Sequence, residues 1–300
     1  MKKNEKKFKI ETLSAHLGKN PFENHGIPSP PVYRTSTILR QSMASYRNKD
    51  VKYTYGRNGT PTSESLTNSI ASLYNADGCV LAPSGMSAIT TGLMSTIKSN
   101  DHVLFPDSVY GSTRRFIKEE FPRLNIEYEF YNPRDLINLE SLIKINTTVI
   151  YLESPGTYTF EIIDIEKVIS ICKKHNLKSI IDNTWATAIF FNPLDFEVDI
   201  VIEAVTKYIS GHSDIMMGAV VANGENLESI ERWTRNSGIC VSPDDIYMSL
   251  RGLRTLPLRL KMSSENSIAT AHFLETMHEV KNVIHPALKQ HPDHEIWKKD

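Results

Sequence analysis

The chain has 300 residues, of which 40% are hydrophobic and 23% are charged, and its formal net charge is −1. This composition is typical of a soluble globular protein with room for one large domain and part of another. The balanced charge provides no overall field that would attract nucleic acid or an anionic membrane. No apolar stretch approaches the ~18 residues of a membrane-spanning helix, so we expect no transmembrane helix and no membrane partner.

Residues 1–60 are polar, contain several prolines and show no helical or strand period. The basic stretch at residues 2–7 is not followed by an apolar run, so we expect a solvated tail and no signal peptide. A segment of this kind seldom builds its own core. We therefore predict that residues 1–60 form an N-terminal arm that lies on a neighbouring subunit.

Short apolar runs alternate with helical stretches from residue 61 onward. Six runs are typical of buried parallel strands: residues 79–81, 102–105, 148–152, 179–181, 199–202 and 219–221. Between them, residues 165–176 carry apolar side chains at helical spacing. The alternation predicts an α/β domain over residues 61–250, built on a mostly parallel, doubly wound sheet.

The C-terminal part continues with a helical pattern from residue 244 to about 280, which we expect to form one long helix. We assign residues 251–300 to a linking helix and the beginning of an incomplete smaller domain. The three cysteines, Cys79, Cys172 and Cys240, are far apart and form no metal-binding motif. This cysteine usage favours a reducing cytoplasm and no structural zinc.

Two of the predicted strands lead to ionisable residues. The run 179–181 ends at Asp182, and Lys207 follows the run 199–202. Either residue alone is more often a turn, helix-cap or solvated loop residue. The carboxyl ends of strands in a doubly wound sheet, however, are where ligands bind. Together the two residues suit pyridoxal 5'-phosphate (PLP), because a lysine forms a Schiff base with its aldehyde and an aspartate keeps its ring nitrogen protonated.

The motifs around both residues resemble the Cys/Met-metabolism family of PLP enzymes, from about Thr12 to the last residue. These motifs are Asp182-Asn183-Thr184-Trp185-Ala186-Thr187, Thr206-Lys207-Tyr208 and Gly211-His212-Ser213-Asp214. Residues 55–62, 242–245 and 251–256 resemble the β-lyase branch more than the γ-enzymes. The resemblance implies the PLP-dependent transferase-like fold (aspartate aminotransferase fold type I), and a homodimer or homotetramer with shared active sites.

A phosphate site is indicated at residues 83–88, between a strand and a helical run. The free amides at a helix N-terminus favour an anion, while Ser84 alone would equally suit an ordinary helix cap. The resemblance assigns the phosphate to Gly85, Met86 and Thr206. Many family members carry serine at the position of Ala204, so one hydroxyl donor to the phosphate is absent here.

Three further residues receive their roles from the resemblance. Tyr110 follows the strand 102–105, where a core tyrosine would be the common alternative; the family implies that it stacks on the PLP ring and takes part in proton transfer. Tyr55 and Arg57 would otherwise be solvated arm residues. The family implies that they reach the neighbouring subunit and bind its PLP phosphate. No residue is expected to bind a metal.

The resemblance implies a carbon–sulfur β-lyase that cleaves L-cystathionine or related cysteine S-conjugates to a thiol, pyruvate and ammonia, as in transsulfuration and methionine biosynthesis. Lys207 would be the base that removes the Cα proton. Two alternatives stay open. One is a γ-lyase, γ-synthase or methionine γ-lyase of the same family. The other is an inactive, C-terminally truncated chain that binds PLP, because the family's substrate-carboxylate arginine lies in a segment that this sequence does not contain.

Overall fold

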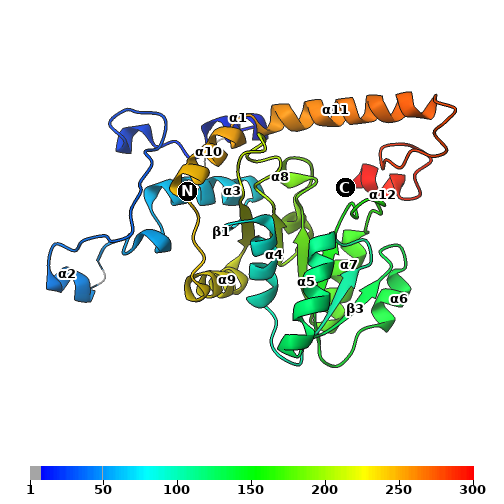
Figure 1. The fold of residues 1–300 in the computed structure, drawn as a ribbon, viewed down its shortest axis with the longest axis horizontal. Coiled ribbons are helices and arrows are strands. Elements are labelled where there is room, and N and C mark those ends of the chain that lie inside the picture. Colours follow the sequence, from blue (N-terminus) through cyan, green and yellow to red (C-terminus); the bar gives the residue numbers. More distant parts are fainter. Residues whose placement is uncertain (1–7, 49) are drawn as a thin grey trace.

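The computed structural model describes residues 8–48 and 50–300, and the solvated tail expected at residues 1–7 lies outside this range. A seven-stranded sheet with the order β1-β7-β6-β5-β4-β2-β3 forms its centre (Figure 1). The strands are β1 Gly78–Ala82, β2 His102–Pro106, β3 Glu127–Tyr131, β4 Thr147–Glu153, β5 Lys178–Asp182, β6 Ile200–Glu203 and β7 Gly218–Ala222. Only β7 runs antiparallel to its neighbours β1 and β6, so the predicted mostly parallel α/β sheet is confirmed.

Helices cover both faces of the sheet. The α-helices are α1 Ile10–His16, α2 Met43–Asn48, α3 Pro61–Tyr74, α4 Gly85–Met94, α5 Gly111–Glu120, α6 Leu136–Ser141, α7 Ile165–His175, α8 Thr187–Phe190, α9 Gly224–Ser237, α10 Pro243–Leu253, α11 Leu256–Glu275 and α12 His294–Lys299. Short 3₁₀ helices occupy Pro21–Glu23, Gly56–Asn58, Pro122–Leu124 and Pro193–Phe196.

Alternate strand residues divide the core into two apolar layers. Ile180 and Ile202 pack in the layer that contains residues of α4, α5 and α9. Ile181 and Val201 pack in the other layer, with residues of α3, α7 and α10. Because successive side chains of a strand point to opposite faces, burial of both faces requires the continuous apolar runs found in the sequence.

The structure differs from the predicted elements in two places. The single helix expected from residue 244 to about 280 is two helices, α10 and α11, which meet at Arg254 and Thr255. Pro257 lies in the first turn of α11, and a proline has no amide hydrogen to continue the helix that precedes it. Strand β3 is an additional element that was not predicted. It is a partly exposed outer strand, and its glutamates interrupt the apolar run.

The N-terminal arm is only partly separate from the chain's own core. Leu13 and Leu17 of the α1 region pack against the core, and Ser14 is fully buried. Residues beyond α1 extend away from the sheet, at the left of Figure 1, and expose large apolar side chains such as Phe22 and Leu39. The arm's contact with a neighbouring subunit stays a prediction, as do the three domain boundaries.

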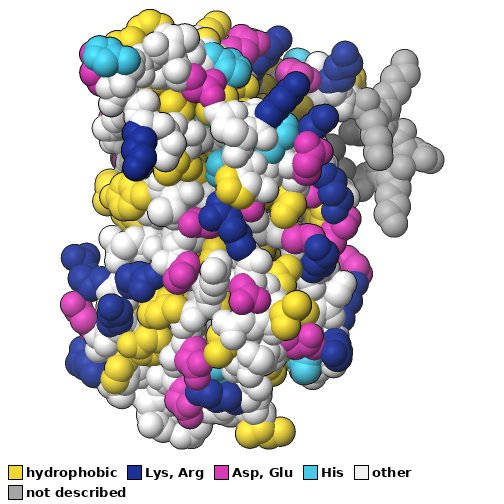
Figure 2. All heavy atoms as spheres, turned by 90° about the vertical axis from the view of Figure 1, so that its right-hand side faces the viewer, with side chains coloured by type: hydrophobic (Ala, Val, Ile, Leu, Met, Phe, Trp, Pro, Cys, Tyr) yellow, Lys and Arg dark blue, Asp and Glu magenta, His cyan; other side chains and the backbone are white. Residues whose placement is uncertain are grey.

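The last residues fold back toward the sheet. Helix α11 runs along the top of Figure 1, and the segment after it returns to place α12 beside the domain. Within the described residues, no helix has both the length and the apolar character needed to cross a membrane. On the face in Figure 2, acidic and basic side chains are interspersed.

Candidate active site

The carboxyl ends of β4 and β5 bring two acidic residues side by side. Glu153 and Asp182 are register partners on these neighbouring parallel strands, so their side chains lie on the same face of the sheet. Asp182 accepts a hydrogen bond from the backbone N–H of Thr184 at 3.0 Å. Burial raises the pKa of Asp182, and the hydrogen bonds from Thr184 offset only part of that effect.

Asp182 is suited to a cationic ligand. Among the residues that the structure describes, none supplies a positive charge that perturbs its carboxyl group. A carboxylate in such a place is costly unless it is paired with a cation. The protonated ring nitrogen of PLP would supply that charge, so the environment of Asp182 fits this cofactor.

Lys207 lies in a tight loop that follows β6. Its backbone N–H donates to the Ala204 carbonyl at 2.9 Å, and its own carbonyl accepts from Gly211 at 2.9 Å. Arg259 of α11 braces the loop by donating to the carbonyl of Ile209 at 3.3 Å. The backbone of Lys207 is therefore held, while its side chain is exposed. A fixed backbone with an accessible amine is what a covalent cofactor bond requires.

The N-terminus of α4 lies beside this loop, and we refer to these two segments, residues 83–88 and 204–211, as the cradle; its binding of a phosphate stays a prediction. Ser84 is the helix N-cap, and its hydroxyl oxygen accepts from Ser87 at 3.0 Å, so its capping role is confirmed. The amides of Gly85 and Met86, the first two helical residues, have no carbonyl partner within the helix and are suited to an anion. A Cβ atom at Gly85 would lie 2.8 Å from the Cβ of Ala204. The small side chain of Ala204 therefore allows the helix end to contact the lysine loop.

The hydroxyl group of Thr206, a predicted phosphate ligand, is bonded to the protein backbone. Its hydroxyl oxygen accepts from the Met217 amide at 2.9 Å, and the hydroxyl donates to the Met217 carbonyl at 3.1 Å. This pair joins the lysine loop to the start of β7. To donate to a phosphate, the hydroxyl hydrogen would have to leave the Met217 carbonyl.

Tyr110 begins α5 close to the two carboxyl groups. Its backbone N–H donates to Oε2 of Glu153 at 2.8 Å. Its side chain is 46% exposed, so it is not the core tyrosine that the alternative interpretation would have required. The structure thus brings Tyr110 to the end of β4, the strand next to β5 and its last residue Asp182.

Tyr55 and Arg57 of the N-terminal arm do not contact the candidate site of their own chain through any hydrogen bond among the described residues. Arg57 donates to the carbonyl of Arg235, in the last turn of α9, at 2.7 Å. Tyr55 is exposed and forms an isolated β-bridge with Thr37. The hydrogen bonds found among residues 8–48 and 50–300 do not connect either residue to Asp182 or Lys207. Their action in a neighbouring subunit therefore stays a prediction.

Sequence reasoning missed Glu153, although a signal was present. Glu153 ends an apolar strand in the same way as Asp182 ends β5. It also assigned no role to Trp185 and Tyr208, which line a cavity of about 630 Å³ between the sheet domain and the segment that includes α11 and Trp297. No group of three potential metal ligands occurs in the part of the chain that the structure covers.

Comparison with known proteins identifies the class to which this fold and site belong. Residues 11–300 match the model of the Cys/Met metabolism PLP-dependent enzymes, and the chain belongs to this family. It is therefore a PLP-dependent enzyme of cysteine and methionine metabolism, and the predicted cofactor is confirmed at the level of the family.

Individual proteins of known sequence or structure are similar to almost the whole chain. A putative cystathionine beta-lyase of Rhizobium johnstonii is 43% identical, over 97% of this chain and 74% of the relative. An L-alanine/L-glutamate racemase of Wolbachia pipientis wMel is 37% identical, over 97% of this chain and 75% of the relative. The crystal structure of metB from Corynebacterium glutamicum superimposes with a TM-score of 0.93 at 32% identity, over 98% of this chain and 76% of that one.

Proposed function

We propose that the chain is a carbon–sulfur β-lyase that converts L-cystathionine, or a related cysteine S-conjugate, to a thiol, pyruvate and ammonia. The observation that carries the proposal is the placement of Asp182 at the end of β5 and of the exposed Lys207 in the loop that follows the neighbouring strand β6. The β-lyase motifs of residues 55–62 and the relative from Rhizobium johnstonii favour β-elimination over the other reactions of the family.

Each residue has a distinct task in this proposal. When bound, PLP supplies a protonated ring that withdraws electrons from the substrate Cα. Asp182 keeps a negative charge beside the ring nitrogen and so maintains its proton. Gly85 and Met86 direct free backbone amides at the phosphate. Lys207 holds the cofactor and, when its amine is released, takes the proton from the substrate Cα.

The chemistry beyond Cα needs few further groups. Loss of the Cα proton to Lys207 allows the bond between Cβ and sulfur to break, with the thiolate as leaving group. Tyr110 would stack on the cofactor ring and move a proton near the reacting atoms. A β-elimination requires one proton abstraction, whereas a γ-elimination requires a second proton to be removed at Cβ. The product therefore distinguishes the two.

The assembly completes the proposed site. Tyr55 and Arg57 would bind the phosphate in a neighbouring subunit of a homodimer or homotetramer, because the planar guanidinium of Arg57 suits a phosphate. We also propose that the enzyme acts in the cytoplasm. The free thiols of Cys79, Cys172 and Cys240 are compatible with a reducing compartment.

The racemase relative gives a second candidate function. Racemisation of an amino acid needs the same removal of the Cα proton and then its return to the opposite face. The relative of that name from Wolbachia pipientis is 37% identical over 97% of the chain. The proposed base Lys207 and the exposed Tyr110 could serve such a reaction without any cleavage of Cβ–S.

One experiment separates these functions. The purified chain is loaded with PLP and incubated with L-cystathionine, and in parallel with L-alanine and L-glutamate. We expect pyruvate and homocysteine in equal amounts from cystathionine. Production of 2-oxobutyrate would replace the proposal with a γ-enzyme, D-amino acids would favour the racemase, and no product at all would favour the inactive PLP-binding chain. Lys207→Ala is the control that should abolish any of these activities.

A further inference from the structure

Glu153 is a buried acidic residue to which the proposed mechanism gives no task. It is the last residue of β4 and is 8% exposed. Its Oε2 accepts the backbone N–H of Tyr110 at 2.8 Å, and its Oε1 accepts the hydroxyl of Thr157 at 2.5 Å. Both carboxyl oxygens are thus bonded to groups outside β4. The side chain ties the beginning of α5 to the loop that follows β4.

The position of Glu153 relates it directly to the candidate cofactor site. It is the register partner of Asp182, and the two side chains share one face of the sheet. Burial and, secondarily, the charge of Asp182 raise the pKa of Glu153 to about 8. A second acidic group is therefore kept next to Asp182 at a cost to stability, which requires a compensating reason such as its two hydrogen bonds.

We propose that Glu153 is a positioning residue that fixes the backbone of Tyr110 beside Asp182, so that the tyrosine ring keeps one orientation toward the bound cofactor. This inference rests on the role proposed above for Tyr110. A hydrogen bond from an amide to a buried acceptor oxygen is directional, so it fixes the backbone of the residue that donates it. Tyr110 is 46% exposed, and the hydrogen bond that the structure records between it and Glu153 is at its backbone, so the anchor is there.

The second partner of Glu153 belongs to a loop that is packed against the same segment. The amide of Thr157 donates to the Ser108 carbonyl at 2.8 Å. A Cβ atom at Gly156 would lie 2.3 Å from the Ser108 hydroxyl oxygen, so only glycine permits this approach. The loop and the residues before Tyr110 are therefore held as one unit, and Glu153 lies between them.

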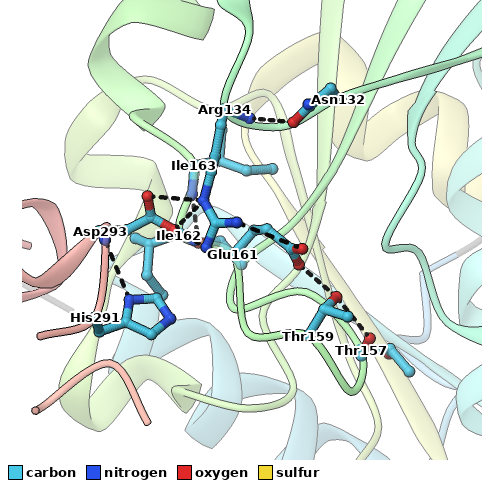
Figure 3. Close-up of polar contacts among 10 residues, drawn as sticks. Asn132, Arg134, Thr157, Thr159, Glu161, Ile162, Ile163, His291 and Asp293 are labelled. Atoms are coloured by element: carbon cyan, nitrogen blue, oxygen red, sulfur yellow. Dashed lines mark hydrogen bonds and ion pairs between the residues drawn. The ribbon is translucent and has the colours of Figure 1, made fainter. Parts of the chain in front are cut away.

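Further contacts extend from this loop to the C-terminal segment (Figure 3). The hydroxyl of Thr159 donates to Glu161 at 2.5 Å, and the amide of Thr159 donates to the Thr157 carbonyl at 2.9 Å. Glu161 lies 3.9 Å from Arg134, and Arg134 pairs with the buried Asp293 at 2.8 Å. These contacts give the loop a fixed support, which a positioning residue needs if it is to transmit a defined geometry.

Two substitutions separate the hydrogen bonds of Glu153 from its ionisable group. In Glu153→Gln, the amide oxygen accepts from Tyr110 and the amide NH₂ donates to the hydroxyl oxygen of Thr157, so both bonds persist without an ionisable group. In Glu153→Asp, the carboxyl group persists, but it is withdrawn by one carbon–carbon bond, about 1.5 Å. The aspartate therefore cannot hold both partners.

The first measurement is hydrogen exchange of the Tyr110 amide in the PLP-free chain. We expect Glu153→Asp to accelerate this exchange by about tenfold or more, and Glu153→Gln to stay within about threefold of the parent. Thr157→Val removes the other donor only and is the matched control, which should leave the Tyr110 amide protected. Unchanged exchange in Glu153→Asp, or equal acceleration in the glutamine variant, would overturn the proposal.

The second measurement is the circular dichroism of PLP bound to the chain, which depends on a fixed environment of the cofactor ring. Glu153→Gln should retain the signal, whereas Glu153→Asp should lose at least half of it. An intact signal in Glu153→Asp would contradict the link from Glu153 to the cofactor. Neither measurement requires turnover, so failure to form pyruvate would refute the lyase proposal without altering these two outcomes.

Discussion

Replacing Gly85 with alanine tests whether the N-terminus of α4 and the lysine loop form a single cradle. A Cβ atom at Gly85 would lie 2.8 Å from the Cβ of Ala204, whereas carbon atoms in contact are roughly 3.5–4.0 Å apart. The two backbones would have to separate by about 0.7–1.2 Å to relieve the clash. Overpacking of this kind typically costs about 1–3 kcal/mol.

The expected consequence is weaker cofactor binding. The amides of Gly85 and Met86 would move relative to Lys207, while a bound cofactor must reach both the helix end and the lysine. We expect the dissociation constant of PLP to rise about 5- to 150-fold, which corresponds to that free energy. It can be measured by titrating the PLP-free chain with PLP and following the absorbance of the bound form.

The neighbour that causes the clash provides the matched control. Ala204→Gly removes the opposing methyl group, so the double variant Gly85→Ala, Ala204→Gly should recover most of the lost affinity. Ala204→Gly alone should bind PLP nearly as well as the parent, apart from the small cost of a more flexible loop. If Gly85→Ala binds PLP within twofold of the parent, or if the double variant binds it as weakly as the single one, the N-terminus of α4 and the lysine loop do not bind PLP as one unit.

Three other perturbations address the remaining residues of the site. Asp182→Asn should still bind PLP but lower turnover about a hundredfold or more, because the amide cannot hold the ring nitrogen protonated; near-parental turnover would remove Asp182 from this role. Mixed oligomers of Arg57→Ala and Lys207→Ala subunits should regain activity that neither variant has alone, since one site of a hybrid would contain neither change; hybrids that form and stay inactive would count against a shared site. Glu203, whose pKa burial raises to about 8, binds its proton more tightly when folded, so the stability of the PLP-free chain should fall as the pH rises from about 5 to 8. Glu203→Gln should flatten this fall in thermal unfolding scans, and an equally steep fall in that variant would show that Glu203 is not its source.

Local sequence patterns predicted the strands that carry Asp182 and Lys207 better than they predicted the contacts around these residues. Asp182 and Lys207 could be placed because each follows a run of apolar residues that the two-sided burial of a parallel strand requires. The break between α10 and α11 depends on Pro257 and was also visible in the sequence, but the continuous helical periodicity concealed it. In this case the helical pattern was recognised correctly, but its division into two helices was not.

Other features could not be deduced because they depend on which segments meet in space. The bond from Tyr110 to Glu153 joins residues on two different strand ends, and no periodicity encodes the register of β4 against β5. The hydroxyl of Thr206 bonds Met217, eleven residues along the chain, and its role toward a phosphate stays a prediction. Polar side chains have several potential partners, and only tertiary structure decides among them.

The position of β7 in the sheet has a consequence for folding of the chain during its synthesis. The first strand, β1, pairs only with β7, the last, through partners such as Gly78 and Ala222. Gly218 of β7 also lies so close to the Ser84 carbonyl that a Cβ atom there would be 2.5 Å away. Both sides of the cradle thus depend on β7, which is synthesised after the other six strands of the described sheet. A nascent chain that ends before β7 would lack a finished cradle, so this fold should form slowly and acquire its cofactor only after most of the domain has been synthesised.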